Sequence, residues 1–452
     1  MRKFLFLLLL MPVCMSAARP VTISREAAIA DVDSLVAAIE EVEVDPYALL
    51  DKDVFYKAVA DTKKSFTADS VTPAQMYLAL SRLTGMFRQG HLGVSRSYNI
   101  IGDSGVVFPF GSMLKVIPGS HKVILTLDTV VDGVRVKKGE EIVSINGRKT
   151  PEIVESYLKH TPMEKDAFGC SYLSGDMDFL MWCENPDVKS FDVVLSDGGK
   201  TRKHTFNGVA VNKLISPPKE KFVPYDYKLL NDSVMLFSFN TCYWDSEFAY
   251  FLRKMNKEAR DKGVKHLIID VRSNGGGNSR AGDEVCRYLT DQKFNGFGGS
   301  KVKISNSVLK SYGKRAADMG LNNYKVDSVY VNMDQDELEM ELPYDAKYRF
   351  PGKSYLLIGP GTFSSASNFA WEYWKFVPGT VIGEETGGVN ICVGDVIGKN
   401  LPNSKFRMFI PWKIFYHYGA KDGDPIQGTI PDIQVPAEEA LTRTLRLIET
   451  GK

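Results

Sequence analysis

The sequence has almost no net charge. Its 452 residues hold 56 Lys and Arg against 55 Asp and Glu, which gives a formal charge of +1 at pH 7. Proteins that bind nucleic acid or anionic membrane surfaces through charge carry a basic excess, so neither partner is expected. The apolar share of 44% and the charged share of 25% are ordinary globular values and exclude disorder as the main state.

Long apolar runs are missing after the first residues. Arg2 and Lys3 precede the apolar stretch 4–12, and the small residues 16–18 end at Ala18. This pattern predicts a secretory signal peptide over residues 1–18, too short for a membrane span. We therefore expect an exported protein, in the periplasm or cell envelope. No later stretch reaches the roughly 18 apolar residues that a span requires.

Cysteine and histidine are scarce, with six of each. Cys14 offers a lipid anchor as a minor alternative, although Val13 stands where a lipoprotein signal has Gly, Ala or Ser. The other five cysteines match no zinc spacing, and buried free thiols are favoured over a Cys170–Cys183 disulfide. No histidine pair has ligand spacing, so no metal and no cofactor are expected.

The chain changes pattern three times. Residues 24–90 have helical periodicity, with a second helix over 72–86 that has Pro73 in its first turn. Short strands follow at 123–125 and 141–145, with a turn at Asn146-Gly147, and a helix at 151–158. Further strands are predicted within 188–206. From about residue 224, apolar strands at 233–239, 266–271 and 355–359 alternate with helices, which predicts an α/β fold with a covered parallel sheet. Residues 301–349 are charged and irregular and are interpreted as an insertion or lid.

Two strand-to-helix turns could carry chemistry. Residues 270–278 (DVRSNGGGN) follow a buried strand, and their glycines could turn amide groups outward to hold an oxyanion. Residues 359–370 (GPGTFSSASNFA) make the second turn, where a serine would stand near a positive helix end. Considered alone, the second turn is better explained by a plain Ser-rich helix cap.

A serine nucleophile needs a base. His91 lies between glycines just after a predicted helix, a setting that suits a side chain displayed into a cleft. His417 is the reserve candidate, and His266 begins a buried strand and is interpreted as structural.

Taken together, these motifs resemble the tail-specific, or C-terminal processing, serine peptidase family. Its superfamily includes the tricorn protease core and the interphotoreceptor retinoid-binding protein modules. The matching motifs are 270–277, the nucleophile turn Ser365-Ala366-Ser367-Asn368, the turn 381–388 and the C-terminal signature 428–435, and residues 133–158 resemble half of a PDZ module. Asn368 departs from the usual Glu.

The resemblance implies a ClpP/crotonase-like α/β core with an N-terminal helical region and a small PDZ-like β-rich module. The expected division is 1–18 signal peptide, 19–100 helical region, 101–165 PDZ-like module, 166–223 connecting β-rich segment and 224–452 peptidase core. The family's Ser–Lys branch has Lys where Val389 stands, so a Ser–Lys dyad is not expected. The tricorn-like branch uses a His that matches His91.

The resemblance also implies a mechanism. Ser365 would attack a peptide carbonyl, His91 would accept its proton and Asp424 would orient the imidazole, with the amides of Gly276 and Ala366 as the oxyanion hole. Gly275, Phe110 and Gly111 are candidates for binding the substrate, a polypeptide cut near its C-terminal tail. The alternatives are an inactive exported binding protein of the same fold and a peptide-docking scaffold that works through the PDZ-like segment alone.

Overall fold

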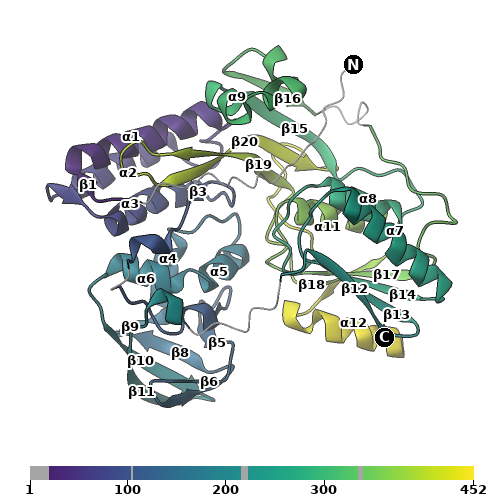
Figure 1. Cartoon of the computed structure of the whole chain (residues 1–452), viewed down its shortest axis with the longest axis horizontal. Coiled ribbons are helices and arrows are strands. Elements are labelled where there is room, and N and C mark those ends of the chain that lie inside the picture. Colours follow the sequence, from purple (N-terminus) through teal and green to yellow (C-terminus); the bar gives the residue numbers. More distant parts are fainter. Residues whose placement is uncertain (1–19, 103–104, 215–221, 334–338, 452) are drawn as a thin grey trace.

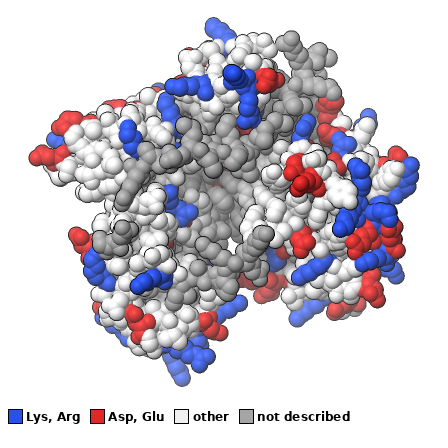
Figure 2. All heavy atoms as spheres, viewed as in Figure 1, with Lys and Arg blue, Asp and Glu red and all other residues white. Residues whose placement is uncertain are grey.

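The computed structural model describes residues 20–102, 105–214, 222–333 and 339–451 (Figure 1). The predicted signal peptide and Cys14 lie outside these residues. Within them, no helix is long and apolar enough to cross a bilayer. Basic and acidic side chains alternate over the right-hand part of the face in Figure 2. The five described cysteines are free thiols, as expected.

Three helices open the described chain: α1 (Arg25–Val42), α2 (Lys52–Ser65) and α3 (Pro73–Gly85). Ser24 caps α1 by accepting a hydrogen bond from the amide of Ala27. Thr72 caps α3 and forms a capping box with Gln75, and Pro73 is the first residue of the helix. This confirms the helix predicted there. These caps satisfy amides that the first turn of a helix leaves without partners.

A six-stranded sheet occupies the middle of the chain. Its order is β11-β10-β8-β5-β4, and β9 (Arg148–Lys149) pairs with β8. The strands are β4 (Leu114–Val116), β5 (Val123–Leu125), β8 (Glu141–Ile145), β10 (Ser190–Asp197) and β11 (Lys200–Asn207). Helices α4 (Thr150–Leu158), α5 (Asp166–Ser174) and α6 (Met177–Glu184) accompany it. One sheet thus includes strands from both the expected PDZ-like module and the expected connecting segment.

The second half forms the predicted α/β core. Its sheet has the order β12-β13-β14-β17-β18-β21, and all pairs are parallel except β12–β13. The central strands are β13 (Val234–Phe239), β14 (His266–Asp270), β17 (Lys353–Ile358) and β18 (Thr380–Gly383). β12 (Tyr225–Asn231) and β21 (Ile433–Gln434) are the edges, and the helices are α7 (Ser246–Asp261), α8 (Arg280–Arg287), α11 (Ser365–Phe376) and α12 (Ala440–Thr450). The strands are apolar because helices cover both faces.

A further sheet joins the core to the N-terminal helices. It has the order β16-β15-β20-β19, and the short β3 (Gly93–Val94) pairs with β20. Its strands are β15 (Phe297–Ile304), β16 (Ser328–Asn332), β19 (Ile391–Asn400) and β20 (Arg407–His417). The prediction that 301–349 is irregular is wrong over much of its length: β15, α9 (Asn306–Tyr312), α10 (Arg315–Asp318) and β16 lie there. β15 has buried residues at alternate positions, which fixes it in the sheet.

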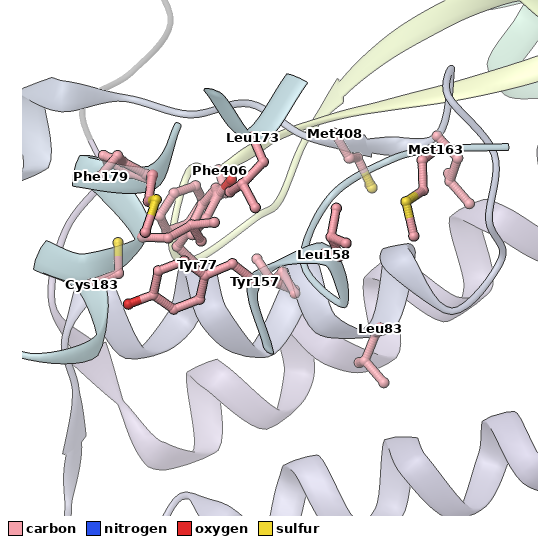
Figure 3. Packing of buried hydrophobic residues seen from close by; sticks show 14 of the residues in the cluster. Tyr77, Leu83, Tyr157, Leu158, Met163, Leu173, Phe179, Cys183, Phe406 and Met408 are labelled. Carbon is pink, nitrogen blue, oxygen red and sulfur yellow. The ribbon is translucent and has the colours of Figure 1, made fainter. Parts of the chain in front are cut away.

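The N-terminal helices, the middle sheet and the β19–β20 hairpin share one apolar core. Tyr77 of α3 packs edge-on against Phe179 of α6 at 4.9 Å and also contacts Phe406, at 6.0 Å between ring centres. Figure 3 shows these rings beside Tyr157 and Met408. The same cluster includes residues of β15, β19 and β20, so segments far apart in the sequence hold the helices in place.

Candidate active site

The two predicted turns meet at one edge of the core sheet. β14 and β17 are parallel neighbours, so their carboxyl ends lie side by side. The amide of Phe363 donates to Asn274 O at 3.0 Å, and Thr362 Oγ1 donates to Val271 O at 2.8 Å. These bonds join the glycine loop to the serine turn.

Ser364 stands at the point of the serine turn. Its backbone has φ 52° and ψ −128°, a conformation that costs a non-glycine residue about 1–3 kcal/mol. α11 begins at the next residue, so the positive end of the helix lies beside it. Such a strained strand-to-helix turn presents a serine hydroxyl outward, as in the nucleophile elbow.

Gly276 makes this turn possible. A Cβ on Gly276 would lie 2.7 Å from Ser364 Cβ and 2.9 Å from Phe363 O, and its φ is +105°. Both the space and the backbone therefore require glycine. On the other side, a Cβ on Gly388 would lie 3.0 Å from Ser364 N, so the turn 381–388 also packs against the serine.

His91 faces Ser364. Its Nε2 lies 3.1 Å from Ser364 Oγ, although the two residues are 273 positions apart. β3 begins two residues after His91 and pairs with Met408 and Phe409 of β20, which anchors the histidine loop to the sheet. The structure therefore confirms that His91 meets the serine turn.

Aromatic rings hold the imidazole from its face. The ring of His91 stacks on Phe363 with centroids 4.7 Å apart, and Phe363 stacks on Phe168 of α5 at 4.2 Å and 9°. This stack links α5, one of the helices that accompany the middle sheet, to the serine turn. It also removes water from one face of the imidazole, and burial lowers the pKa of His91 to about 4.

A buried carboxyl lies beside the histidine loop. Glu164 has no hydrogen-bond partner for either oxygen among the described residues, and neither does Nδ1 of His91. A Cβ on Gly90 would lie 2.5 Å from Glu164 Oε2, which places the carboxyl against the residue before His91. Burial raises the pKa of Glu164 to about 7, against a smaller opposing effect of the Gly90 backbone.

Ser365 does not face His91. Its hydroxyl is buried and donates to Gly277 O at 2.8 Å, so the structure brings the neighbouring Ser364, and not the predicted nucleophile Ser365, to His91. The family motif corresponds to Ser365-Ala366-Ser367-Asn368, and its first serine is therefore the predicted nucleophile. The residue that adopts the strained turn is the one before this motif.

The predicted oxyanion donors are also corrected. The amide of Gly276 donates to Asn274 Oδ1 at 2.9 Å, and the amide of Ala366 donates to Phe363 O at 3.0 Å. Both N–H groups are occupied. Within the described chain no acceptor is found for the amides of Ser365 and Gly275, and Gly275 is exposed.

Asp424 lies in a turn and not beside the imidazole. Its carboxylate accepts the amide of Lys421 at 3.0 Å, and Nδ1 of His91 has no partner among the described residues, so the structure does not pair Asp424 with the imidazole as predicted. The reserve base His417 is buried against Trp371 at 5.5 Å between ring centres, and neither ring nitrogen bonds to a described residue. No side-chain hydrogen bond joins it to the serine turn in the described part of the chain, and its ring packs against Trp371 and Phe297.

Phe110 and Gly111 are not placed to bind a substrate tail. Phe110 is fully buried against Phe108 and Phe206. A Cβ on Gly111 would lie 2.5 Å from Cγ of Asp178, so a carboxyl group already occupies that side of the loop. Both residues are corrected to core positions.

The remaining motif residues organise the site. Arg272 forms a two-pronged ion pair with Asp270, at 2.9 and 2.6 Å, and donates to Ala437 O. Asn368 Nδ2 donates to Gly296 O at 2.8 Å, which explains how Asn serves at the position where the family has Glu. Lys399 pairs with Glu41 of α1 at 3.5 Å and is therefore no substitute for a dyad lysine.

Sequence reasoning missed Ser364 and Glu164. Ser364 lies within the predicted turn 359–370, but the feature that distinguishes it from Ser365 is its positive φ, which the residue type does not encode. Glu164 lies between two predicted elements, 73 positions after His91, and only folding reveals its burial.

Comparison with known proteins supports the family resemblance. The model of peptidase family S41 matches residues 233–435. A search of curated protein sequences found no match. The crystal structure of mature CPAF is similar over 94% of this chain and 96% of that chain, with a TM-score of 0.63 at 12% identity. An alanine mutant of CPAF gives a TM-score of 0.66 at 12% identity over the same shares.

At 12% identity, these structures indicate a shared fold and do not by themselves indicate a shared function. The fold they share extends over nearly the whole chain, including the N-terminal helices and the middle sheet that lie outside the family match. The family match covers both turns that build the serine site. Residues 233–435 are similar to peptidase family S41, and the protein is a serine-type peptidase.

Proposed function

We propose that the protein is an exported endopeptidase in which Ser364 is the nucleophile and His91 the general base. The observation that carries the proposal is the 3.1 Å contact between His91 Nε2 and Ser364 Oγ, at a serine with φ 52°. Export rests on the leader-like pattern of residues 1–18.

The chemistry is acyl transfer. Ser364 Oγ attacks the carbonyl carbon of a peptide bond while His91 Nε2 takes the hydroxyl proton, and the imidazolium then gives that proton to the leaving amine. Water, activated by the same imidazole, hydrolyses the acyl-enzyme. The amides of Ser365 and Gly275 would stabilise the oxyanion, and losing one such donor typically costs about 3–4 kcal/mol of barrier.

Glu164 would act as the positioning acid. A hydrogen bond between its carboxyl and Nδ1 would give both buried groups a partner and would stabilise the imidazolium. An unpaired buried carboxyl is costly, so the surroundings favour such a pairing once a proton reaches His91.

The substrate is a polypeptide, and we propose that cleavage does not require a free tail. The loop expected to bind a tail carboxylate is buried, and Asp178 stands beside Gly111. A second carboxylate there would meet like charge. Peptides with a free and an amidated C-terminus should therefore be cut at equal rates, and strong dependence on the free acid would restore the tail-specific reading.

Fluorophosphonate labelling of the mature chain tests the nucleophile. Ser364→Ala and His91→Ala should abolish labelling, whereas the matched neighbour Ser365→Ala should retain it if the variant is folded. Labelling lost in Ser365→Ala and kept in Ser364→Ala would overturn the assignment. A folded wild type that neither labels nor cleaves peptides would favour the inactive binding protein.

A further inference from the structure

A second group of reactive side chains lies away from the serine site, on the middle unit. His121, Asp166 and Cys170 bring one nitrogen, one oxygen and one sulfur within 4.8 Å of one another. His121 Nε2 lies 2.9 Å from Asp166 Oδ1, and Cys170 Sγ lies 3.8 Å from Asp166 Oδ2. The side chains come from the β4–β5 connection and from one face of α5, where Asp166 and Cys170 are four residues apart.

We propose that these three residues form a zinc site that fastens the β4–β5 connection to α5. A set of thiolate, imidazole and carboxylate suits Zn²⁺ better than Mg²⁺ or Ca²⁺, which prefer oxygen ligands alone. Ligands at tetrahedral zinc are about 3.2–3.8 Å apart, given bond lengths near 2.0–2.3 Å. The sulfur–oxygen distance of 3.8 Å lies at the upper limit of that range, the nitrogen–oxygen distance of 2.9 Å is slightly shorter, and all three atoms lie within 4.8 Å of one another.

The surroundings of His121 match those of a zinc ligand. While Nε2 faces Asp166 and Cys170, Nδ1 faces Glu155 of α4, with 3.8 Å between Nδ1 and Oε1. Metal-bound histidines almost always give their other N–H to a carboxylate, a carbonyl or water, which fixes the tautomer. Cys170 is fully buried, whereas the side chains of His121 and Asp166 are 17% and 42% exposed, so an ion can enter from one side.

Binding is balanced in charge and protons. Zn²⁺ takes the lone pair of His121 Nε2, the carboxylate of Asp166 and the sulfur of Cys170, whose thiol proton leaves to solvent. The dication and two anionic ligands sum to zero, and a water completes the fourth position. Without an ion, the same side chains form an ordinary hydrogen-bonded cluster. The test must distinguish this cluster from a zinc site.

The site would also act on the catalytic unit. Phe168 lies on α5 between Asp166 and Cys170, and its ring stacks on Phe363 beside Ser364. Fixing α5 would therefore fix one end of the ring stack against which His91 rests.

The test uses the mature chain with Co²⁺ as a spectroscopic probe and Zn²⁺ in competition with a chromogenic chelator. The wild type should bind one ion per chain and show a thiolate-to-cobalt charge-transfer band. Cys170→Ser and His121→Asn should weaken zinc binding at least about 100-fold, and Glu155→Gln about 10-fold. The matched control Cys183→Ser removes another buried thiol and should bind as the wild type does.

Two results would overturn the proposal: a wild type without one-to-one zinc uptake, or a cobalt thiolate band that persists in Cys170→Ser. Melting in a chelator shows which variants are folded. His121→Asn changes a partly exposed side chain and keeps the test decisive if loss of the buried thiol unfolds Cys170→Ser. Because the readout is metal binding, its failure is distinguishable from failure of the Ser364 assignment.

Discussion

At the scale of single residues, the site depends on a close approach of two backbones. Gly276 touches Ser364, and each residue has a positive φ. The strain at Ser364 is maintained because the glycine loop, the turn 381–388 and α11 surround it. A side chain added at this contact would have to displace Ser364.

Gly276→Ala is expected to abolish activity. The new Cβ would lie 2.7 Å from Ser364 Cβ at a φ of +105°, so the serine turn must shift. We expect a loss of labelling rate of at least about 100-fold and a loss of stability of about 1–3 kcal/mol. Labelling kinetics and thermal melting measure both.

Gly275→Ala is the matched control for stability. A Cβ there would meet nothing within 4 Å, and no positive φ is found at Gly275. The melting temperature should stay near that of the wild type. Equal destabilisation by both substitutions would contradict the role assigned to the Gly276–Ser364 contact.

The pH dependence of labelling should have two steps. Burial lowers the pKa of His91 to about 4 and raises that of Glu164 to about 7. As pH falls through about 7, Glu164 takes up a proton and no longer stabilises the imidazolium, so the rate drops about 10-fold. Near pH 4, His91 itself is protonated and labelling stops.

Glu164→Gln should remove only the upper step. The variant's rate should be flat between about pH 5 and 8, at the level to which the wild type falls below its upper step. Rate profiles of both proteins measure this. If the upper step persists in Glu164→Gln, another group titrates there and the positioning role fails.

At the scale of elements, α1 holds the turn between β19 and β20 with one carboxylate. Asp31 is fully buried and accepts the amide of Asn403 at 3.0 Å and that of Ser404 at 2.6 Å. Hydrogen bonds to a charged group are among the stronger ones in a protein. This contact fastens the hairpin to the helix that covers it.

Asp31→Ala should therefore destabilise the protein by about 2–3 kcal/mol, because two buried amides lose their acceptor. The control on the same helix is Asp33→Ala, whose side chain is 60% exposed in an ion pair with Lys63. Exposed pairs contribute about 0–1 kcal/mol. Denaturant unfolding compares the two variants, and equal losses would contradict the argument.

Much at this scale could be predicted from the sequence. The helix at Pro73 and the strand 266–270 carry local signals: a cap, or an apolar run of the right length. β19 and β20 carry weaker ones, because a long hairpin pairs with β3 and β15 from distant parts of the chain. The one-residue choice between Ser364 and Ser365 was beyond reach, because φ decides it and both residues are serine.

The zinc group and Glu164 show the same limit. His121 and Asp166 are 45 positions apart, so no ligand spacing is visible along the chain. The prediction that 301–349 is irregular is wrong for a related reason. The charges of this segment mark the exposed face of strands and helices, and alternation with buried residues was obscured by the polar side chains.

At the scale of the whole molecule, several acids are buried without a direct ion pair among the described residues, although cationic side chains lie within electrostatic reach. Glu372 is fully buried, with both oxygens unpartnered among the described residues, and burial raises its pKa. Burial likewise raises the pKa of Glu43 to about 8 and of Asp283 to about 7. Each binds a proton in the folded state at pH values where the unfolded chain has lost it.

Stability should therefore fall as pH rises from about 6.5 to 8. A raised folded-state pKa contributes stability below the unfolded pKa, and this contribution is lost as pH passes the folded value. Below about 6.5, buried histidines oppose this trend: burial lowers the pKa of His160 to about 4 and of His417 to about 3. Their contribution disappears as pH falls.

Glu372→Gln should flatten the decline between pH 6.5 and 8, since the amide has no proton to lose. Exposed Glu247→Gln on α7 is the control and should leave the slope unchanged. Denaturant unfolding at each pH supplies the free energies. A wild type whose stability rises over this interval would show that other groups outweigh the buried acids.

The separation between the two reacting residues has a consequence for how the protein is made. The histidine belongs to the first quarter of the chain and the serine to the last quarter, and β20, which is synthesised after the serine, holds the histidine's loop in place. A chain that is still being synthesised therefore cannot bring His91 and Ser364 together. We therefore expect no activity from the proposed site until β20 has been synthesised and folded. The order of these segments along the chain would delay activity without a separate inhibitor.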